Sequence, residues 1–273
     1  MASLVGGFLL PHDPLIFSAP DAPGADIRDA STRAFAEIAR RIRELEVDTI
    51  ITVGADHYRM FGPHCVPQCL IGIGDVHGPA EPGFLPEQRT IPAHPELASH
   101  LLREGIAQGI AWSFSKDLLA DHATFVPYLC CYEQVPRARV IPVYLNEAVA
   151  PVLPNRLVRS VGESIRAAVQ SWPGAERVAV VGTGGCSHWV GAPGMGSINS
   201  DLDDQMLALV RKGDLDALCA LSDDMVLKEA GNGALEYKNW ICAMAATQAR
   251  SARLIYYKAV PQWVAGVAFA ELN

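Results

Sequence analysis

The fold class of this chain is decided by residues 26–54, DIRDASTRAFAEIARRIRELEVDTIITVG. Apolar residues recur at helical spacing through the first part of this stretch, with arginines and glutamates between them, which predicts an amphipathic helix over residues 26–45. The β-branched run 48–54 that follows ends at a glycine and is typical of a buried strand. A helix followed directly by a buried strand is the repeating unit of an α/β fold.

The same alternation continues along the chain. Residues 5–10, 140–145 and 178–183 read as further strands, residues 155–170 as a second amphipathic helix, and residues 63–95 as a long Gly- and Pro-rich excursion with short strands. Beyond residue 201 we expect helices over 202–212, 215–221 and 234–249, and a strand over 253–257. These elements predict a single α/β domain over residues 1–273, with a central, mostly parallel or mixed sheet flanked by helices on both faces.

The composition of the 273 residues excludes several classes of protein. The formal net charge of −8 argues against nucleic acid or an anionic membrane surface as a partner. No apolar run approaches the roughly 20 residues of a membrane-spanning helix. Seven cysteines without any C-x-x-C pair argue against a disulfide framework, so a cytoplasmic location is expected.

Three histidines follow three of the predicted strands. His12 comes after the run 5–10, His57 three residues after Gly54, and His188 after the run 178–183. Sites in open α/β sheets form at the carboxyl ends of strands. A single histidine there is usually structural, but three in the same topological position favour a shared site.

A metal is one ligand that such histidines could bind. Iron(II) in oxygenases often takes two histidines and one carboxylate on one face, and His12 and His57 could supply the imidazoles. Spacing does not select the carboxylate from 30 Asp and Glu residues. Glu236 stands out because it lies in an otherwise apolar predicted helix, where a carboxylate is costly unless it is paired or coordinated. It is equally consistent with an exposed glutamate in the first turn of that helix.

Residues 182–185, Gly-Thr-Gly-Gly, precede His188. They fit neither G-x-G-x-x-G nor the Walker pattern, so we interpret them as a sharp turn that points His188 into a cavity. A Ser-His-acid hydrolase using Ser187 is disfavoured because no G-x-S-x-G motif surrounds it.

Five short motifs occur in order along the chain: Pro11-His12-Asp13-Pro14, Ala55-Asp56-His57-Tyr58, Ala120-Asp121-His122-Ala123, Gly182-Thr-Gly-Gly-Cys-Ser-His188 and Gly231-Asn-Gly-Ala-Leu-Glu236. The ending, with Tyr256-Tyr257 and Pro261-Gln-Trp-Val-Ala-Gly266, completes the set. With these motifs the chain resembles, over nearly its whole length, the class III extradiol ring-cleavage dioxygenases. That superfamily includes the protocatechuate 4,5-dioxygenase β subunit and 2,3-dihydroxyphenylpropionate dioxygenase.

The resemblance implies a role for each matching residue. His12, His57 and Glu236 would hold Fe(II), and no other cofactor is implied. His188 would be the acid–base residue, and His122 would assist proton transfer or oxygen positioning. Asp56 is either a partner that orients an imidazole or a plain turn residue.

The implied reaction is cleavage of a catechol-like ring, aromatic or heteroaromatic, with incorporation of both atoms of O2, in the degradation of aromatic compounds. A catechol, a hydroxypyridone or an aminophenol would each satisfy bidentate chelation. We expect a homo-oligomer, alone or with a small accessory subunit. Tyr58, Trp189 and Phe125 either line the ring pocket or belong to the core, and no arginine is clearly placed to bind a substrate carboxylate.

Two alternatives stay open at this point. The first is a zinc-dependent hydrolase with the same His-His-Glu set, and the second is a non-catalytic binding protein on the same scaffold. Four further histidines lie outside the motifs and are expected to face solvent: His64, His77, His94 and His100. His94 is expected in the turn before a helix over residues 96–104.

Overall fold

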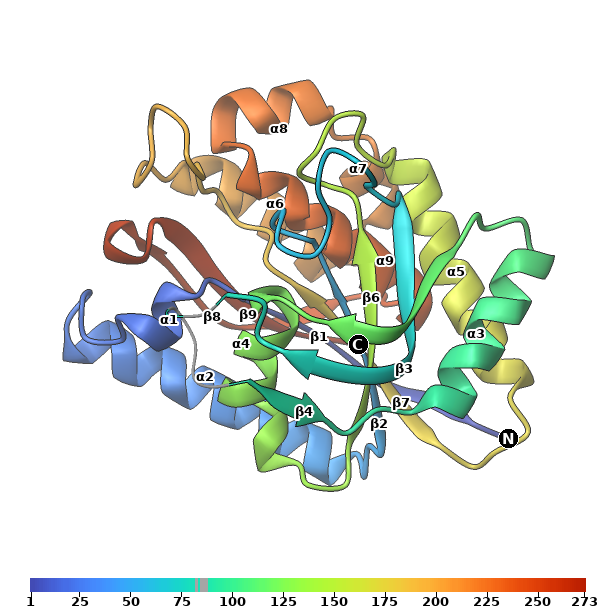
Figure 1. The fold of residues 1–273 in the computed structure, drawn as a ribbon. Coiled ribbons are helices and arrows are strands. Elements are labelled where there is room, and N and C mark those ends of the chain that lie inside the picture. Colours follow the sequence, from blue (N-terminus) through green and yellow to red (C-terminus); the bar gives the residue numbers. More distant parts are fainter. Residues whose placement is uncertain (82, 84–87) are drawn as a thin grey trace.

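The computed structural model describes residues 1–81, 83 and 88–273. Within this described part, nine strands form one mixed sheet (Figure 1). The strands are β1 (Ser3–Leu10), β2 (Thr49–Gly54), β3 (Cys69–Gly78), β4 (Arg89–Ile91), β5 (Ser113–Leu119), β6 (Arg139–Leu145), β7 (Arg177–Thr183), β8 (Ala252–Val260) and β9 (Ala265–Leu272).

The sheet has a parallel centre and antiparallel flanks. Its order is β4-β3-β6-β2-β7-β1-β9-β8, with β5 paired to β3. Strands β6, β2, β7 and β1 run parallel, whereas β3 is antiparallel to β6, and β9 is antiparallel to both β1 and β8. Every residue of β2 is buried, as expected of a strand covered on both faces. The carboxyl ends of β1, β2 and β7 therefore meet at one edge.

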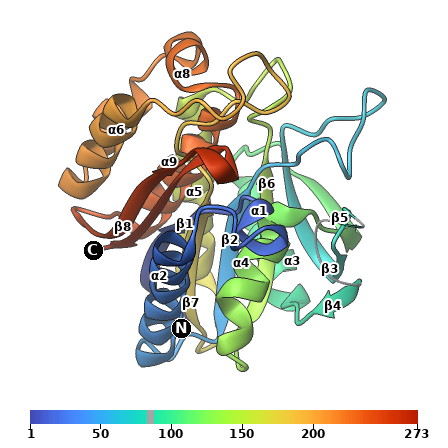
Figure 2. The ribbon, with the colours of Figure 1, turned by 90° about the vertical axis from the view of Figure 1, so that its left-hand side faces the viewer.

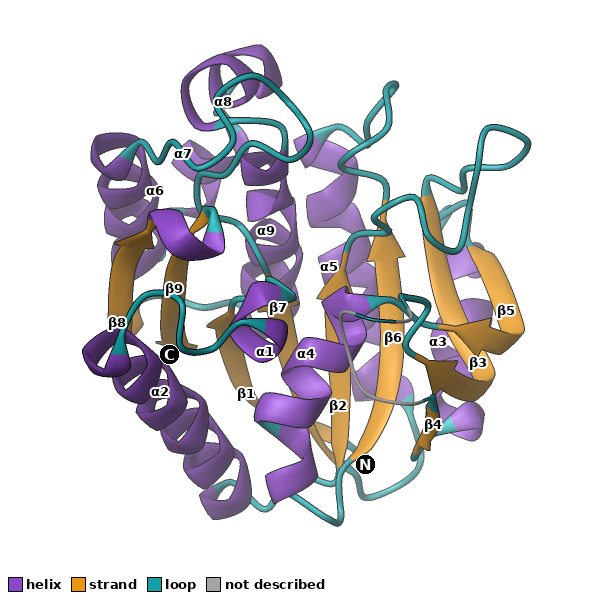
Figure 3. Cartoon of the chain, turned by 60° about the vertical axis from the view of Figure 1, so that its left-hand side comes forward, coloured by secondary structure: helices purple, strands orange, loops and turns teal. Residues whose placement is uncertain are grey.

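Helices cover both faces of the sheet (Figure 3). One layer holds α3 (Pro95–Ala107), α5 (Asn155–Ser171) and α9 (Tyr237–Thr247), extended by α6 (Ser200–Lys212), α7 (Leu215–Cys219) and α8 (Asp223–Ala230). The opposite layer holds α1 (Leu15–Ser18), α2 (Ala25–Glu44) and α4 (His122–Cys130), with α2 against the β1, β9 and β8 side (Figure 2). Short 3-10 turns complete the chain: η1 (Tyr132–Gln134), η2 (Gly233–Glu236) and η3 (Pro261–Trp263).

The fold class and most predicted elements are confirmed. The structure adds two strands, β5 and β9, and three helices, α1, α4 and α8, that the sequence patterns did not predict. The helix expected over residues 234–249 was wrong in one respect: it begins as the 3-10 turn η2 and becomes the α-helix α9 only at Tyr237. Glu236 therefore ends a tight turn and does not lie on a regular helix. None of the helices in the described ranges has an apolar stretch long enough to cross a membrane.

Helix α9 is buried among α5, α7 and the sheet, and its position fixes that of Glu236 just before it. A close approach to α5 is possible because residue 162 is glycine. A Cβ there would lie 2.3 Å from the carbonyl oxygen of Cys242.

A buried ion pair holds the first turn of α9. Lys238 is fully buried, and its Nζ donates to Asp223 Oδ1 and to Asn155 Oδ1, both at 2.6 Å. Asp223 begins α8 and Asn155 begins α5, so one ammonium joins three helices. A buried ammonium is costly unless it is paired, and these contacts provide the pairing.

Removing the carboxylate of Asp223 should destabilise the fold. We expect Asp223→Ala to lower the free energy of unfolding by about 2–3 kcal/mol, which is less than for a fully buried pair because the Asp223 side chain is 31% exposed. The matched control is Asp224→Ala, which removes an exposed carboxylate from the same first turn of α8. Urea denaturation of both variants measures the difference. Equal losses would show that the pair with Lys238 is not what anchors α9.

Candidate metal centre and active site

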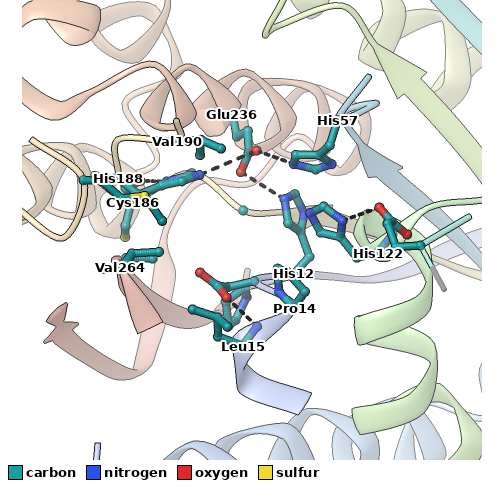
Figure 4. A pocket seen from close by; sticks show the side chains of 18 of the residues that line it. His12, Pro14, Leu15, His57, His122, Cys186, His188, Val190, Glu236 and Val264 are labelled. Atoms are coloured by element: carbon teal, nitrogen blue, oxygen red, sulfur yellow. Dashed lines mark hydrogen bonds and ion pairs between the residues drawn. The ribbon is translucent and has the colours of Figure 1, made fainter. Parts of the chain in front are cut away.

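The structure brings the predicted site residues together at the carboxyl edge of the parallel strands (Figure 4). His12 follows β1, His57 follows β2 and His188 follows β7. Glu236 reaches the same place from η2, and His122 from the start of α4. All five line one cavity of about 280 Å³.

The proton on His12 is fixed by a chain of hydrogen bonds. The Thr183 hydroxyl donates its one hydrogen to the carbonyl oxygen of Val53 at 3.0 Å. His12 Nδ1, 2.8 Å from the same hydroxyl oxygen, must therefore be the donor. In the neutral ring this leaves a lone pair on Nε2, the nitrogen that faces the cavity.

Asp121 fixes His57 in the same way. Its Oδ2 accepts from His57 Nδ1 at 2.9 Å and from the His57 backbone N–H at 3.0 Å. The other oxygen caps α4 by accepting from the backbone N–H of Ala123. A carboxylate that holds the Nδ1 proton of an imidazole is the usual partner of a metal-ligating histidine, because it leaves Nε2 free to coordinate.

The carboxylate of Glu236 faces the Nε2 atoms of both imidazoles. Its Oε2 lies 3.1 Å from His12 Nε2, and its Oε1 lies 3.0 Å from His57 Nε2. His12 Nε2 and Glu236 Oε2 are both buried and make no hydrogen bond. Two buried acceptors at this distance repel unless a cation lies between them. The donor set therefore fits a cation held by His12, His57 and Glu236.

The buried charges of Glu236 and the neighbouring histidines shift one another's pKa. Burial raises the pKa of Glu236, but His12 and His188 outweigh burial and hold it well below its usual value. Burial lowers the pKa of His57, but Asp121 and Glu236 raise it well above its usual value. The pKa of His122 is held well below normal by burial and by the positive charge on His57. The cluster thus favours an ionised carboxylate with positive charge beside it. Without a metal, that charge includes the proton that His57 Nε2 shares with Glu236 Oε1 at 3.0 Å, and a bound cation would take the place of this proton.

His122 lies beside the proposed metal position but is a less suitable ligand than Glu236. Nitrogens of His12, His57 and His122 lie within 4.8 Å of one another, and the rings of His57 and His122 are 3.8 Å apart. However, Glu236 lies 3.1 Å from His12 Nε2 and 3.0 Å from His57 Nε2, and it brings a negative charge. His122 Nδ1 is 2.6 Å from Glu81 Oε1, which fixes the ring at the cavity wall. Burial and the nearby Asp121 raise the pKa of Glu81 to about 7.

His188 stands on the other side of the carboxylate. Its Nδ1 donates to the carbonyl oxygen of Cys186 at 2.9 Å, and its Nε2 lies 3.8 Å from Glu236 Oε1, too far for a hydrogen bond. Of the turn predicted over residues 182–185, residues 182 and 183 still belong to β7, and the change of direction is made by Gly184 and Gly185, which have positive φ. Gly184 has φ +78°, and a Cβ there would lie 2.0 Å from Glu236 Oε2. Gly233 also lacks room, since its Cβ would lie 1.9 Å from His188 Nε2.

The structure decides between two pairs of alternatives that the sequence left open. Asp56 is the turn residue, because its carboxylate accepts from three backbone N–H groups at residues 59–61, whereas the orienting role belongs to Asp121. Tyr58, Trp189 and Phe125 do not line the cavity. Its apolar wall consists of smaller side chains and prolines, including Pro14, Leu15, Val190, Met195 and Val264.

Four polar residues near the cavity were not singled out from the sequence: Thr183, Glu81, Asp13 and Arg59. Asp13 and Arg59 each lie within two residues of a proposed ligand, which was the available signal. Burial raises the pKa of Asp13 to about 7. No arginine could be assigned to a substrate carboxylate from the sequence, and the structure places Arg59 on the cavity wall.

The remaining histidines lie outside this cavity. His64 is exposed, and His77 and His100 are half-buried. The expectation that His94 faces solvent was wrong, although it does lie directly before α3 as predicted. It is 3% exposed and lies 3.1 Å from the hydroxyl of Thr49, because the preceding residue, Ala93, bridges to Val140 beside the sheet.

Comparison with known proteins points to one family. Residues 6–268 match the family described as the catalytic LigB subunit of aromatic ring-opening dioxygenase. The chain is 25% identical to 2,3-dihydroxyphenylpropionate/2,3-dihydroxicinnamic acid 1,2-dioxygenases of Klebsiella pneumoniae, over 94% of this chain and 95% of that one, and of Cupriavidus necator, over 95% of both chains.

A solved structure shares the fold. An uncharacterized protein from Escherichia coli K12 superposes with a TM-score of 0.61 at 10% identity, over 98% of this chain and all of that one. The sequence relatives confirm the resemblance inferred from the five motifs. The chain belongs to the family of catalytic LigB subunits of aromatic ring-opening dioxygenases.

Proposed function

We propose that this chain cleaves an aromatic ring bearing two adjacent hydroxyl groups, using O2 and an Fe(II) ion held by His12, His57 and Glu236. Family membership establishes the reaction class, which is extradiol ring cleavage by a dioxygenase. The observation that carries the metal assignment is the Glu236 carboxylate, which faces the Nε2 atoms of His12 and His57 at 3.1 and 3.0 Å.

Two histidines and one carboxylate are the donor set of non-haem Fe(II) oxygenases, in which the ion keeps open positions for substrate and O2. Bound there, Fe(II) would supply a chelation site for the two hydroxyls and a route for electron density to O2. The residues that supply the donors are held from behind by Thr183 and Asp121, so the donors are oriented before any ion binds.

His188 is proposed as the acid–base residue. Its Nδ1 proton is committed to the carbonyl oxygen of Cys186, so Nε2 is the atom that accepts a proton from a substrate hydroxyl and later returns it. This nitrogen lines the cavity on the far side of Glu236 from His12. His122, held by Glu81 on the opposite wall, is placed to donate or accept a second proton.

The substrate is proposed to carry an anionic group. The relatives above are named for substrates with a carboxylate on a three-carbon chain. Arg59 is the only arginine or lysine among the described residues that line the cavity. Its guanidinium forms no ion pair within the described part of the chain. A guanidinium suits a carboxylate because it offers two parallel donors.

Loss of the Glu236 charge should abolish metal binding. We expect Glu236→Gln to weaken Fe(II) binding by more than about 100-fold, since loss of a ligand exceeds the ~10–100-fold cost of losing an outer partner. Anaerobic titration with Fe(II) and metal analysis of the desalted protein measure this. The control is Glu229→Gln, at an exposed glutamate close by in sequence.

The same metal analysis tests the proposal as a whole. Wild-type protein that retains zinc and turns over without consuming O2 would make the chain a hydrolase and overturn the proposed reaction. Iron-loaded protein that binds catechols but never opens them in air would make it a binding protein.

Replacing His188 should separate metal binding from turnover. We expect His188→Phe to keep its Fe(II) and lower kcat by about 100- to 10,000-fold, the usual contribution of an acid–base group. The measurement is the absorbance of the ring-opened product under air, with iron content determined in parallel. His64→Phe, at an exposed position, is the control. Full turnover in His188→Phe would remove His188 from the role of base.

Removing the Arg59 guanidinium should weaken binding of an acidic substrate and leave binding of a neutral one unchanged. For Arg59→Met we expect the KM for 2,3-dihydroxyphenylpropionate to rise about 10- to 100-fold, the loss of a charge-assisted hydrogen bond. The KM for 3-propylcatechol, which has the same side-chain length without the carboxylate, should stay unchanged. Equal changes for both substrates would show that Arg59 does not bind the anionic group.

A further inference from the structure

A second buried carboxylate lies behind the loop that carries His188. Asp203, in the first turn of α6, is fully buried, and no lysine or arginine in the described ranges forms an ion pair with it. Its Oδ1 accepts from the backbone N–H of Ser187 at 2.7 Å. Its Oδ2 accepts from the Ser187 hydroxyl at 3.1 Å and from the Tyr257 hydroxyl at 2.8 Å.

These bonds immobilise the residue next to His188. Ser187 Oγ also accepts from the backbone N–H of Asn199 at 2.9 Å, and the Ser187 carbonyl oxygen accepts from the backbone N–H of Gly266 at 3.0 Å. Every polar group of Ser187 is thus bonded. Its partners come from the N-terminus of α6 and from β9, and β8 adds Tyr257 as a further partner of Asp203.

Keeping the Asp203 carboxylate away from water costs free energy. A neutral side chain could anchor the loop without this cost. Burial raises the pKa of Asp203, which reports the penalty for keeping the charge away from water. Room for it depends on a glycine, because a Cβ at Gly266 would lie 2.4 Å from Asp203 Oδ2 and 2.9 Å from the Cβ of Cys186. A neutral side chain would fill this space without the penalty.

The connection to the active site is short. The Ser187 backbone N–H that Asp203 holds belongs to the peptide whose carbonyl oxygen, that of Cys186, accepts the Nδ1 proton of His188. Asp203 therefore fixes the group that sets both the tautomer and the direction of the imidazole. We propose that Asp203, supported by Tyr257, is a positioning residue that aims His188 Nε2 into the cavity through Ser187 and the Cys186 carbonyl group.

This inference rests on the proposed role of His188 and is tested with it. We expect Asp203→Asn, which keeps the size of the side chain but removes its charge, to lower kcat by about 10- to 100-fold, the cost of displacing a reacting group by about 1 Å. KM and the Fe(II) content should stay within about twofold, because the proposed metal ligands lie on other segments. Asp204→Asn, at the exposed neighbouring position on α6, should leave all three unchanged.

A double-mutant cycle separates the positioning role of Asp203 from the acid–base role of His188. If Asp203 acts through His188, Asp203→Asn should have no further effect on kcat in the His188→Phe background. Equal losses in both backgrounds, or a normal kcat in Asp203→Asn, would overturn the positioning role while leaving the proposed function intact. A normal kcat in His188→Phe itself would instead overturn the proposed acid–base residue.

Tyr257→Phe covers the case in which Asp203→Asn fails to fold. It removes one of the three hydrogen bonds to Asp203 and leaves the carboxylate in place. We expect a smaller loss of kcat, of about threefold to tenfold, with KM unchanged, and again no effect in the His188→Phe background. A loss that persists in that background would show that Tyr257 acts on the fold and not on His188.

Discussion

The rest of this structure depends on one electrostatic constraint: a buried carboxylate and two imidazole nitrogens face a single point. Glu236 Oε2 lies 3.1 Å from His12 Nε2 with no hydrogen bond between them, and Glu236 Oε1 lies 3.0 Å from His57 Nε2. Such an arrangement is unfavourable in a low-dielectric interior unless a cation occupies the point. The surrounding fold must therefore be rigid enough to hold the acceptors together against their mutual repulsion.

The parallel centre of the sheet provides that rigidity. Because β7 lies between β1 and β2, the hydroxyl of Thr183 at its end can bond both the carbonyl oxygen of Val53 in β2 and the ring of His12 after β1. One side chain thus ties three neighbouring strands together at the site. Asp121 does the equivalent for His57 while it caps α4. The protons that would otherwise compete for the metal-facing nitrogens are directed outward in both cases.

The sequence could predict the parts of the site that follow from strand order. His12, His57 and His188 each follow a recognisable buried strand, so their convergence was expected. Glu236 was different, because η2 enters the site from between two helices, and no spacing relates it to the histidines. Its role came from the family resemblance. Asp121 and Asp56 illustrate the same limit, since the residue beside the ligand in sequence turned out to be the turn residue and the residue 64 positions away orients the ring.

The strand β9 was missed because it begins at the wall of the cavity with the small residues Ala265 and Gly266, so the usual signals of β-branched and aromatic side chains are weak there. The three aromatic residues named from the sequence do not line this wall. Crowding also explains the glycine motif before His188. Gly184 makes room for the carboxylate of Glu236, and Gly233 makes room for the ring of His188. A proposed metal ligand and a proposed acid–base residue must share a few ångströms, and glycine is the residue that lets the backbone pass between them.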